Sequence, residues 1–253
     1  MPEPVTYERV GAAAVLTIDR QERRNAVDGP TAELLKDGYS AFVADDSALV
    51  LILTGAGGVA FCAGADLKAI DTFGPRLGSP EGPLGFTRLT PPKPTIAAIS
   101  GWCLAGGLEL ALWCDLRIAA AGSTLGFPER RWGVPLIDGG TQRLPRIVGL
   151  GRALDIILTG RMVSAEEARD VGLVNEIVPP GAHLDRALEL AEALAGFPQE
   201  TMLADRRSAI EGLGMTLEEG LRLEAQAGPE TFRVAQQGAA RFAGGAGRHG
   251  EGV

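Results

Sequence analysis

The sequence predicts an α/β fold in which most strands pair in parallel. Two apolar runs rich in β-branched residues, 12–20 (AAAVLTIDR) and 48–55 (ALVLILTG), have the pattern of buried strands, and segment 31–46 between them has the pattern of an amphipathic helix. A strand, a helix and a second strand in this order favour a right-handed crossover and parallel pairing. With 253 residues, the chain is long enough for one large or two small domains.

Charge and cysteine content restrict the partners and the compartment that we expect. The chain has 32 acidic and 24 basic residues and a net charge of −8, which disfavours nucleic acid and anionic membranes as partners. The N-terminal residues do not have a signal-peptide pattern, and no window is apolar enough to span a bilayer. Cys62, Cys103 and Cys114 lie in apolar surroundings and fit reduced core thiols, so we expect a cytoplasmic protein.

A glycine cluster after the second strand raises one competing function. Gly55-x-Gly57-x-x-Ala60 follows a strand, as the dinucleotide-binding fingerprint does. That fingerprint needs a helix that begins at the glycines and an acidic residue about 20 positions further on. Here a helix pattern begins only near Asp66, and glycine and proline interrupt the residues that follow. A nicotinamide-dependent enzyme is therefore disfavoured.

Two glutamates lie in surroundings that are too apolar for unpartnered charges. The strand pattern 95–100 (TIAAIS) leads to the small-residue turn 105–107 (AGG), and a helix pattern follows around Glu109. Glu109 is expected in the first turn of this helix, beside free backbone N–H groups, where the alternative role is only to complement the helix dipole. A strand and a turn later, Glu129 can return to the same end of the structure. Two carboxylates in one apolar cleft acquire separated pKa values and can act as acid and base.

The two histidines do not adjoin this region in sequence. His183 opens a late amphipathic segment, and His249 lies in a glycine-rich tail. A nucleophile triad built on histidine is therefore disfavoured. No cluster of histidine, cysteine and carboxylate has the spacing of a metal site, so we expect none.

Taken together, the motifs resemble the crotonase superfamily, that is, the enoyl-CoA hydratase/isomerase superfamily, and most of all its enoyl-CoA hydratases. The resemblance covers roughly residues 5–235, and its ordered motifs at consistent spacing are more specific than any single glycine cluster. The matching motifs are RRNA (23–26), FCAGADLK (61–68), IAAISG (96–101), AGGLELALWCD (105–115), LGFPE (125–129), GGTQRLPRIVG (139–149), LTGR (158–161) and SAEEARDVGLVNEIV (164–178).

The resemblance implies both the architecture and the assembly. Residues 1–195 are expected to form a crotonase-like spiral of repeated ββα units that carries the CoA and catalytic sites. Residues 196–253 are expected to form a C-terminal helical trimerisation region with a flexible tail, and a capping signal at Thr216-x-x-Glu219 precedes one helix, 217–228. The resemblance implies a homotrimer or a dimer of trimers, although the apolar stripes of these helices could equally cover the chain's own core.

The resemblance also assigns roles to residues. Glu109 and Glu129 become the catalytic pair, and the backbone N–H groups of Ala65 and Gly106 become the two donors of an oxyanion hole for the thioester oxygen. Loop 61–68 is similar to the family loop that holds the thioester and adenine ends of CoA. The expected substrate-binding residues are Arg24, Ala63, Asp66, Leu67 and Lys68. For Arg24 and Lys68, which would contact phosphate groups, the alternative is a solvated surface position.

The reaction implied by the resemblance is the addition of water across the double bond of a 2-enoyl-CoA thioester. Its product is a 3-hydroxyacyl-CoA, the intermediate is an enolate, and CoA enters as part of the substrate, so no cofactor is expected. The glycine- and proline-rich segment 71–94 is expected to form a loop with at most one helical turn, which in this family lies over the acyl pocket. The alternatives are a double-bond isomerase of the same superfamily and a catalytically silent acyl-CoA-binding protein.

After Glu129 the sequence departs from the best-known hydratases. Ile137 stands where those enzymes have a glycine whose backbone helps to hold the catalytic water. Asp138 either caps the helix that follows or adds a third acid beside the pair, as in some isomerases of the superfamily. Segment 130–132 (RRW) forms either a wall of the pocket or a subunit surface.

Overall fold

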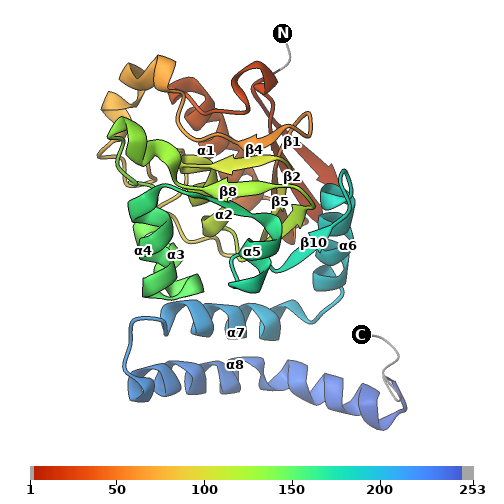
Figure 1. The fold of residues 1–253 in the computed structure, drawn as a ribbon. Coiled ribbons are helices and arrows are strands. Elements are labelled where there is room, and N and C mark those ends of the chain that lie inside the picture. The colour runs from red at the N-terminus through yellow and green to blue at the C-terminus, as the bar shows by residue number, and fades with distance from the viewer. Residues whose placement is uncertain (1–2, 247–253) are drawn as a thin grey trace. The chain divides into compact units, whose positions relative to one another are not determined.

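The computed structural model describes residues 3–246, which form an α/β fold (Figure 1). The chain divides into two compact units, Met1–Leu194 and Ala195–Val253. Within the described residues, no helix is long and apolar enough to cross a membrane.

A six-stranded sheet forms the centre of the first unit. Its strand order is β1-β2-β3-β5-β7-β10, in which β1 pairs antiparallel with β2 and the other neighbours pair in parallel. The strands are β1 (Val5–Val10), β2 (Ala13–Ile18), β3 (Val50–Gly55), β5 (Thr95–Ile99), β7 (Leu116–Ala120) and β10 (Glu176–Val178). The prediction of a mainly parallel sheet is confirmed.

A second sheet has four strands, three of which alternate along the chain with strands of the first sheet. Its order is β4-β6-β8-β9, with the first three strands parallel and β9 antiparallel. Its strands are β4 (Ala60–Cys62), β6 (Trp102–Leu104), β8 (Thr124–Gly126) and β9 (Met162–Ser164). Consecutive strands such as β5 and β6 thus go to different sheets before a helix follows, which agrees with the expected repetition of ββα units.

Both faces of the six-stranded sheet are buried, as is usual for parallel sheets covered by helices. On β3, alternate residues belong to two apolar clusters: Leu51 and Leu53 to one, and Ile52 to the other. Helix α1 (Gly29–Ala44) contributes to the first cluster, and helix α6 (His183–Ala195) contributes to the second. This explains why the central strands of the sequence are continuous apolar runs rather than alternating ones.

Short helices connect the strands around the smaller sheet. They are the 3₁₀ helices η1 (Gln21–Arg23), η2 (Leu67–Arg76) and η3 (Pro128–Trp132) and the α-helices α2 (Gly106–Trp113), α3 (Gly140–Val148), α4 (Leu150–Thr159) and α5 (Ala165–Asp170). The glycines after β3 lead into β4 and not into a helix, which removes the structural basis of the dinucleotide-binding alternative.

The second unit contains two helices, α7 (Gln199–Glu211) and α8 (Leu217–Ala243). Thr216 and Glu219 form the predicted capping box at the start of α8. Residues 196–253 were expected to be a helical region with a flexible tail, but the local pattern gave bounds only for one helix, 217–228, and none for α7. Helix α8 continues past Pro229, where a proline costs one backbone hydrogen bond but does not end the helix. The predicted flexible tail lies, from residue 247 onward, outside the described residues.

The corner between β5 and β6 brings the chain from the central sheet toward α2. Gly101 has φ +60° there, and a Cβ atom on Gly101 would lie only 1.9 Å from the carbonyl oxygen of Val59. The N–H of Trp102 donates to the same carbonyl oxygen (3.1 Å). Glycine is therefore required here both for its conformation and for the close approach of two backbones.

We predict that Gly101→Ala strongly destabilises the protein, by about 3 kcal/mol or more, because the new methyl group displaces backbone as well as straining φ. The matched control is Gly122→Ala, which also has a positive φ (+82°) but has no atom within 4 Å of the new Cβ. We expect the control to lose only about 1 to 2 kcal/mol. Denaturant unfolding of both variants measures the difference, and equal losses would contradict the importance of the close approach.

Candidate active site

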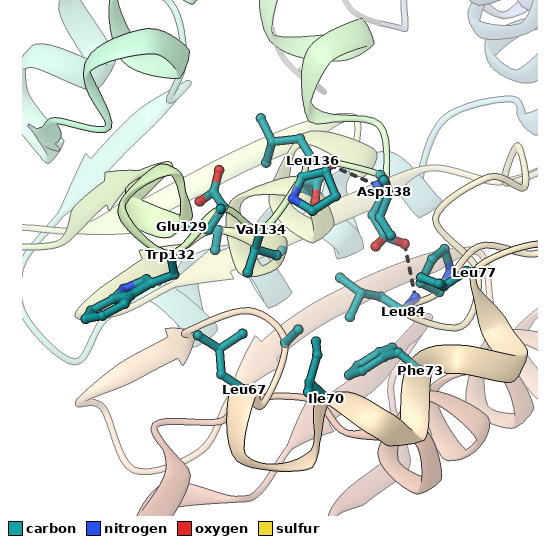
Figure 2. A pocket seen from close by; sticks show the side chains of 18 of the residues that line it. Leu67, Ile70, Phe73, Leu77, Leu84, Glu129, Trp132, Val134, Leu136 and Asp138 are labelled. Atoms are coloured by element: carbon teal, nitrogen blue, oxygen red, sulfur yellow. Dashed lines mark hydrogen bonds between the residues drawn. The ribbon is translucent and has the colours of Figure 1, made fainter.

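A cavity in the first unit has a volume of about 560 Å³. One side is formed by η2 and the residues after it, and the other by η3 and the segment that follows it (Figure 2). In Figure 2, the side chains of Leu67, Ile70 and Phe73 face those of Trp132 and Val134 across the opening. The predicted loop in 71–94 thus does contribute a wall, and the part of it up to Arg76 is 3₁₀ helix.

A tight turn of small residues places Glu109 at this cavity. Ala105 has φ +52° and ψ −127°, an uncommon conformation for a residue with a Cβ atom, and α2 begins at the next residue. Gly107 packs so closely that a Cβ atom would lie 2.0 Å from the carbonyl oxygen of Cys62. Glu109 consequently lies in the first turn of α2, as predicted, with 3% of its surface exposed.

Glu129 reaches the same cavity from β8, which lies next to β6 in the smaller sheet. It follows β8 and lies in the first turn of η3, with 5% of its surface exposed. Both Glu109 and Glu129 line the cavity, so the expectation that the chain returns to the same end is confirmed. Neither carboxylate oxygen of Glu129 has a hydrogen-bond partner among the described residues. A buried carboxyl group without a protein partner is available to a bound molecule.

Glu109, in contrast, is held by two backbone donors. The N–H groups of Asp138 (3.0 Å) and Gly140 (2.7 Å) both donate to its Oε1. A Cβ atom on Gly140 would lie 3.0 Å from this same oxygen, so glycine leaves the space that the carboxylate occupies. The start of α3 therefore fixes the position of Glu109.

Burial raises the pKa of Glu109 to about 8; the nearby charges of Asp138 and Glu129 act in the same direction, and the N–H groups of Gly140 and Asp138 oppose them. Burial also raises the pKa of Glu129 and that of Asp138. Arg143 is the cation whose charge interacts with both Glu109 and Asp138. Burial therefore favours the neutral form of all three acids at the cavity, and Glu109 exchanges its proton near pH 8.

Ala65 and Gly106, the two residues predicted to supply backbone N–H donors, also line the cavity. They are adjacent, because a Cβ atom on Gly106 would lie 3.6 Å from the backbone nitrogen of Ala65. Within residues 3–246, neither N–H has a hydrogen-bond acceptor in the protein. Two neighbouring free N–H groups at a cavity are suited to binding an oxygen that carries negative charge.

The other predicted binding residues divide into two groups. Ala63 and Leu67 line the cavity, whereas Arg24, Asp66 and Lys68 do not. Arg24 and Lys68 are exposed, and neither forms an ion pair within the described part of the chain. The carboxylate of Asp66 is engaged by the protein: it accepts from the N–H of Lys68 (3.1 Å) and pairs with Arg20 (3.2 Å). The substrate contacts of these three residues stay predictions.

The structure corrects one of the two alternatives for Asp138. The N-terminal cap of α3 is Gly139, and no side chain caps this helix. Asp138 is instead buried at the wall of the cavity, where its Oδ1 accepts from the N–H of Leu84 (3.0 Å) and from the hydroxyl of Thr87. It is thus a third acid beside the glutamate pair.

Sequence reasoning left several wall residues unassigned. Trp132 lines the cavity and is 73% exposed, whereas Arg130 and Arg131 are outside the cavity lining. The further apolar wall residues are Ile70, Phe73, Leu77, Leu84, Val134, Leu136 and Ile137. Leu67 was predicted from the resemblance, but for Ile70 no local pattern in the sequence distinguishes a wall residue from an ordinary surface position.

The thiols and histidines lie outside this chemistry. Cys62, Cys103 and Cys114 are buried and free, and burial raises the pKa of Cys62 to about 12, which suppresses its thiolate. His183 is not among the residues that line the cavity, and His249 lies outside the described residues. Over the described range, no group of three or more His, Cys, Asp and Glu side chains is arranged to hold a metal ion.

Comparison with known proteins identifies the family. Residues 8–245 match the family model for enoyl-CoA hydratase/isomerase. The chain belongs to the enoyl-CoA hydratase/isomerase family. Among the curated members of this family, it is 35% identical to the short-chain-enoyl-CoA hydratase of Clostridium acetobutylicum, over 92% of this chain and 91% of that protein. It is 36% identical to the crotonyl-CoA hydratase of Syntrophomonas wolfei, over 89% of this chain and 88% of that one.

Solved structures of the family have the same fold. An enoyl-CoA hydratase of Mycobacterium marinum superposes with a TM-score of 0.89 and is 38% identical in sequence; the match covers 95% of this chain and 96% of that one. The enoyl-CoA hydratase/isomerase fold that the motifs implied is therefore confirmed over nearly the whole chain.

We predict that Glu109→Gln stabilises the protein increasingly as the pH rises from about 5 to 8. Because burial raises the pKa of Glu109 in the folded state to about 8, the folded state of the wild type binds a proton that the unfolded state has released. Wild-type stability therefore falls over this range, by at most about 1.4 kcal/mol per pH unit, whereas the amide side chain of the variant does not titrate.

Chemical unfolding at several pH values measures this difference, with Glu8→Gln on the exposed part of β1 as the control. We expect the control to follow the wild type at every pH. A Glu109→Gln variant whose advantage does not change with pH would contradict the raised pKa.

Proposed function

We propose that the protein is an enoyl-CoA hydratase that adds water to a 2-enoyl-CoA thioester and releases a 3-hydroxyacyl-CoA. The observation that carries the proposal is the combination at one cavity of two buried carboxyl groups, Glu109 and Glu129, with two adjacent free N–H groups, those of Ala65 and Gly106. The names of the relatives of Clostridium acetobutylicum and Syntrophomonas wolfei support the same reaction.

In the proposed reaction, the N–H groups of Ala65 and Gly106 bind the thioester oxygen. Negative charge develops on this oxygen when water attacks C3, and two preorganised donors stabilise the enolate that forms. Glu109 takes a proton from the attacking water, and protonated Glu129 delivers a proton to C2. One water is consumed, and the two glutamates exchange their protonation states.

This division of roles requires one proton on the glutamate pair, with the negative charge on Glu109. Burial by itself favours the protonated form of Glu109, whereas its two N–H donors favour the ionised form. Glu129 has no partner for either oxygen, and a carboxyl group in such a position is more stable when neutral. Because burial raises the pKa of Glu109 to about 8, the ionised form of Glu109 that the reaction needs is the minor one at neutral pH, and its share grows as the pH rises toward 8.

We further propose that Ala63 and Leu67 contact the acyl-thioester part of the substrate, and that Arg24, Asp66 and Lys68 belong to the surface that binds the rest of CoA. The cations Arg24 and Lys68, which form no ion pair within residues 3–246, are suited to phosphate groups. The proposed reaction needs neither a metal nor a redox group, because acid–base chemistry and enolate stabilisation are sufficient for it.

The test is the loss of the near-ultraviolet absorbance of a short 2-enoyl-CoA. We expect turnover by the wild type and a decrease of at least about 10²-fold in kcat for Glu109→Gln and for Glu129→Gln, because each variant removes one proton-transfer group. Glu8→Gln is the control and should keep wild-type turnover.

Unchanged absorbance with the wild type would exclude hydration of that substrate, and a 3-enoyl-CoA would then be offered. The appearance of conjugation with this second substrate would identify a double-bond isomerase. If a series of acyl chains gave no reaction but CoA raised the melting temperature, the protein would be a silent acyl-CoA-binding protein.

We also propose that the protein is cytoplasmic and assembles as a homotrimer or a dimer of trimers. Support comes from apolar side chains that are exposed in the single chain, namely Leu150 and Leu158 on α4 and Leu217, Phe232 and Phe242 on α8. Sedimentation should give the mass of three or six chains. A monomer at micromolar concentration would contradict the assembly and leave the proposed chemistry unaffected.

A further inference from the structure

Asp138 is a buried acid at the cavity that the proposed reaction does not use. It is 4% exposed and lies on the wall beside the glutamate pair. Burial of a carboxylate is costly unless it accepts hydrogen bonds, so the partners of Asp138 indicate what it does.

The side chain of Asp138 holds one wall of the cavity. Its Oδ1 accepts from the backbone N–H of Leu84 (3.0 Å; Figure 2) and from the hydroxyl of Thr87. We call residues 84–87 the wall segment. Leu84 lines the cavity. A Cβ atom added to Gly106 would lie only 2.8 Å from Cδ1 of Leu84. The segment anchored by Asp138 therefore packs directly against a proposed oxyanion donor.

The main chain of Asp138 holds the proposed base. Its N–H donates to Oε1 of Glu109 (3.0 Å), and its carbonyl oxygen accepts from Nη1 of Arg143 (2.9 Å). The other terminal nitrogen of Arg143 donates to the carbonyl oxygen of Thr87 (2.5 Å). Arg143 thus forms a second link between Asp138 and the wall segment, in addition to the hydrogen bonds of the Asp138 side chain.

We propose, on the basis of the proposed hydratase function, that Asp138 is a positioning residue that couples the acyl-pocket wall to Glu109. Displacement of the wall segment pulls on the Asp138 side chain and, through its backbone N–H, shifts the acceptor oxygen of Glu109. The fit of the acyl group is thereby linked to the alignment of the base. The coupling depends on Oδ1 of Asp138 as a hydrogen-bond acceptor. The side-chain oxygen of an asparagine at the same position can therefore take the place of Oδ1.

The charge of Asp138 has a second, separable effect. Three charged groups face Asp138: Arg88 in the loop that precedes β5, Arg143 on α3 and Glu109 on α2. The charged groups that face Glu109 are Asp138, Glu129 and Arg143. The negative charge of Asp138 opposes ionisation of Glu109. Loss of this charge therefore allows the glutamate pair to release its protons at lower pH.

The test compares Asp138→Asn, Asp138→Ala and Thr87→Val by steady-state kinetics with a 2-enoyl-CoA over a range of pH. Asp138→Asn keeps the acceptor oxygen, so KM should stay within about 3-fold of the wild type, while the profile of kcat/KM moves to lower pH by roughly half a unit to one unit. Asp138→Ala should raise KM and lower kcat, each by about 10-fold or more, because both the wall segment and Glu109 lose their position.

Thr87→Val is the matched control for geometry without a change of charge. It removes one donor to Asp138 and leaves both N–H donors to Glu109 in place. We expect a KM raised by a few-fold, about the effect of one hydrogen bond, and an unshifted pH profile. Melting temperatures of all variants, taken at one pH, report whether each is folded.

The Asp138 proposal is overturned if the variants melt at lower temperature but retain the KM, kcat and pH profile of the wild type, since this is the behaviour of a merely structural residue. The protonation of the Glu109 carboxyl group can also be followed without substrate by infrared spectroscopy. The spectrum of the Glu109→Gln variant is subtracted from that of the protein with Glu109, once in the wild-type background and once in the Asp138→Asn background. An unmoved titration there also overturns the proposal. An inactive wild type with a shifted titration would instead refute the hydratase function and leave the coupling intact.

Discussion

The structure depends on the placement of two carboxyl groups in an apolar cavity without an adjoining ion pair. Burial disfavours the ionised form of both Glu109 and Glu129, and no cation is bonded directly to either one in the described residues. The compensation comes from the main chain, which directs two N–H groups at Glu109 and leaves two others free beside it. The tight turns, the glycines and the two-sheet arrangement can be understood as the means of bringing these backbone groups together.

The two sheets divide this task. Strands of the central sheet bury both faces and provide the rigid part of the unit, while the smaller sheet carries the loops that reach the cavity. At each passage from the first sheet to the second, the chain turns sharply, and Gly101 is the clearest example. Helix α2 starts only a few residues after that corner, so an error in its geometry is transmitted to Glu109. The fold and the site are thus joined at the same short segment.

Much of this was accessible from the sequence because it depends on local patterns. Continuous apolar runs predicted the parallel strands, the turn 105–107 predicted the position of Glu109, and ordered motifs predicted the family. The partners of Asp138 were not accessible, since Leu84 and Thr87 are more than 50 positions away and carry no pattern that links them to an acid. Likewise, α8 passes through Pro229, where the local rule predicts an end. Long-range contacts decided the first case, and the second shows that the loss of one backbone hydrogen bond does not end a helix.

The use of backbone N–H groups at this site separates what must stay constant from what is free to change. A main-chain donor is present whatever side chain its residue carries, provided that the residue fits the turn. Ile137 can therefore stand in the cavity wall, and Trp132 or Leu136 can vary in size, without removal of a single donor. Evolution, or a protein engineer, can reshape the cavity residue by residue while its backbone N–H groups are inherited unchanged with the fold.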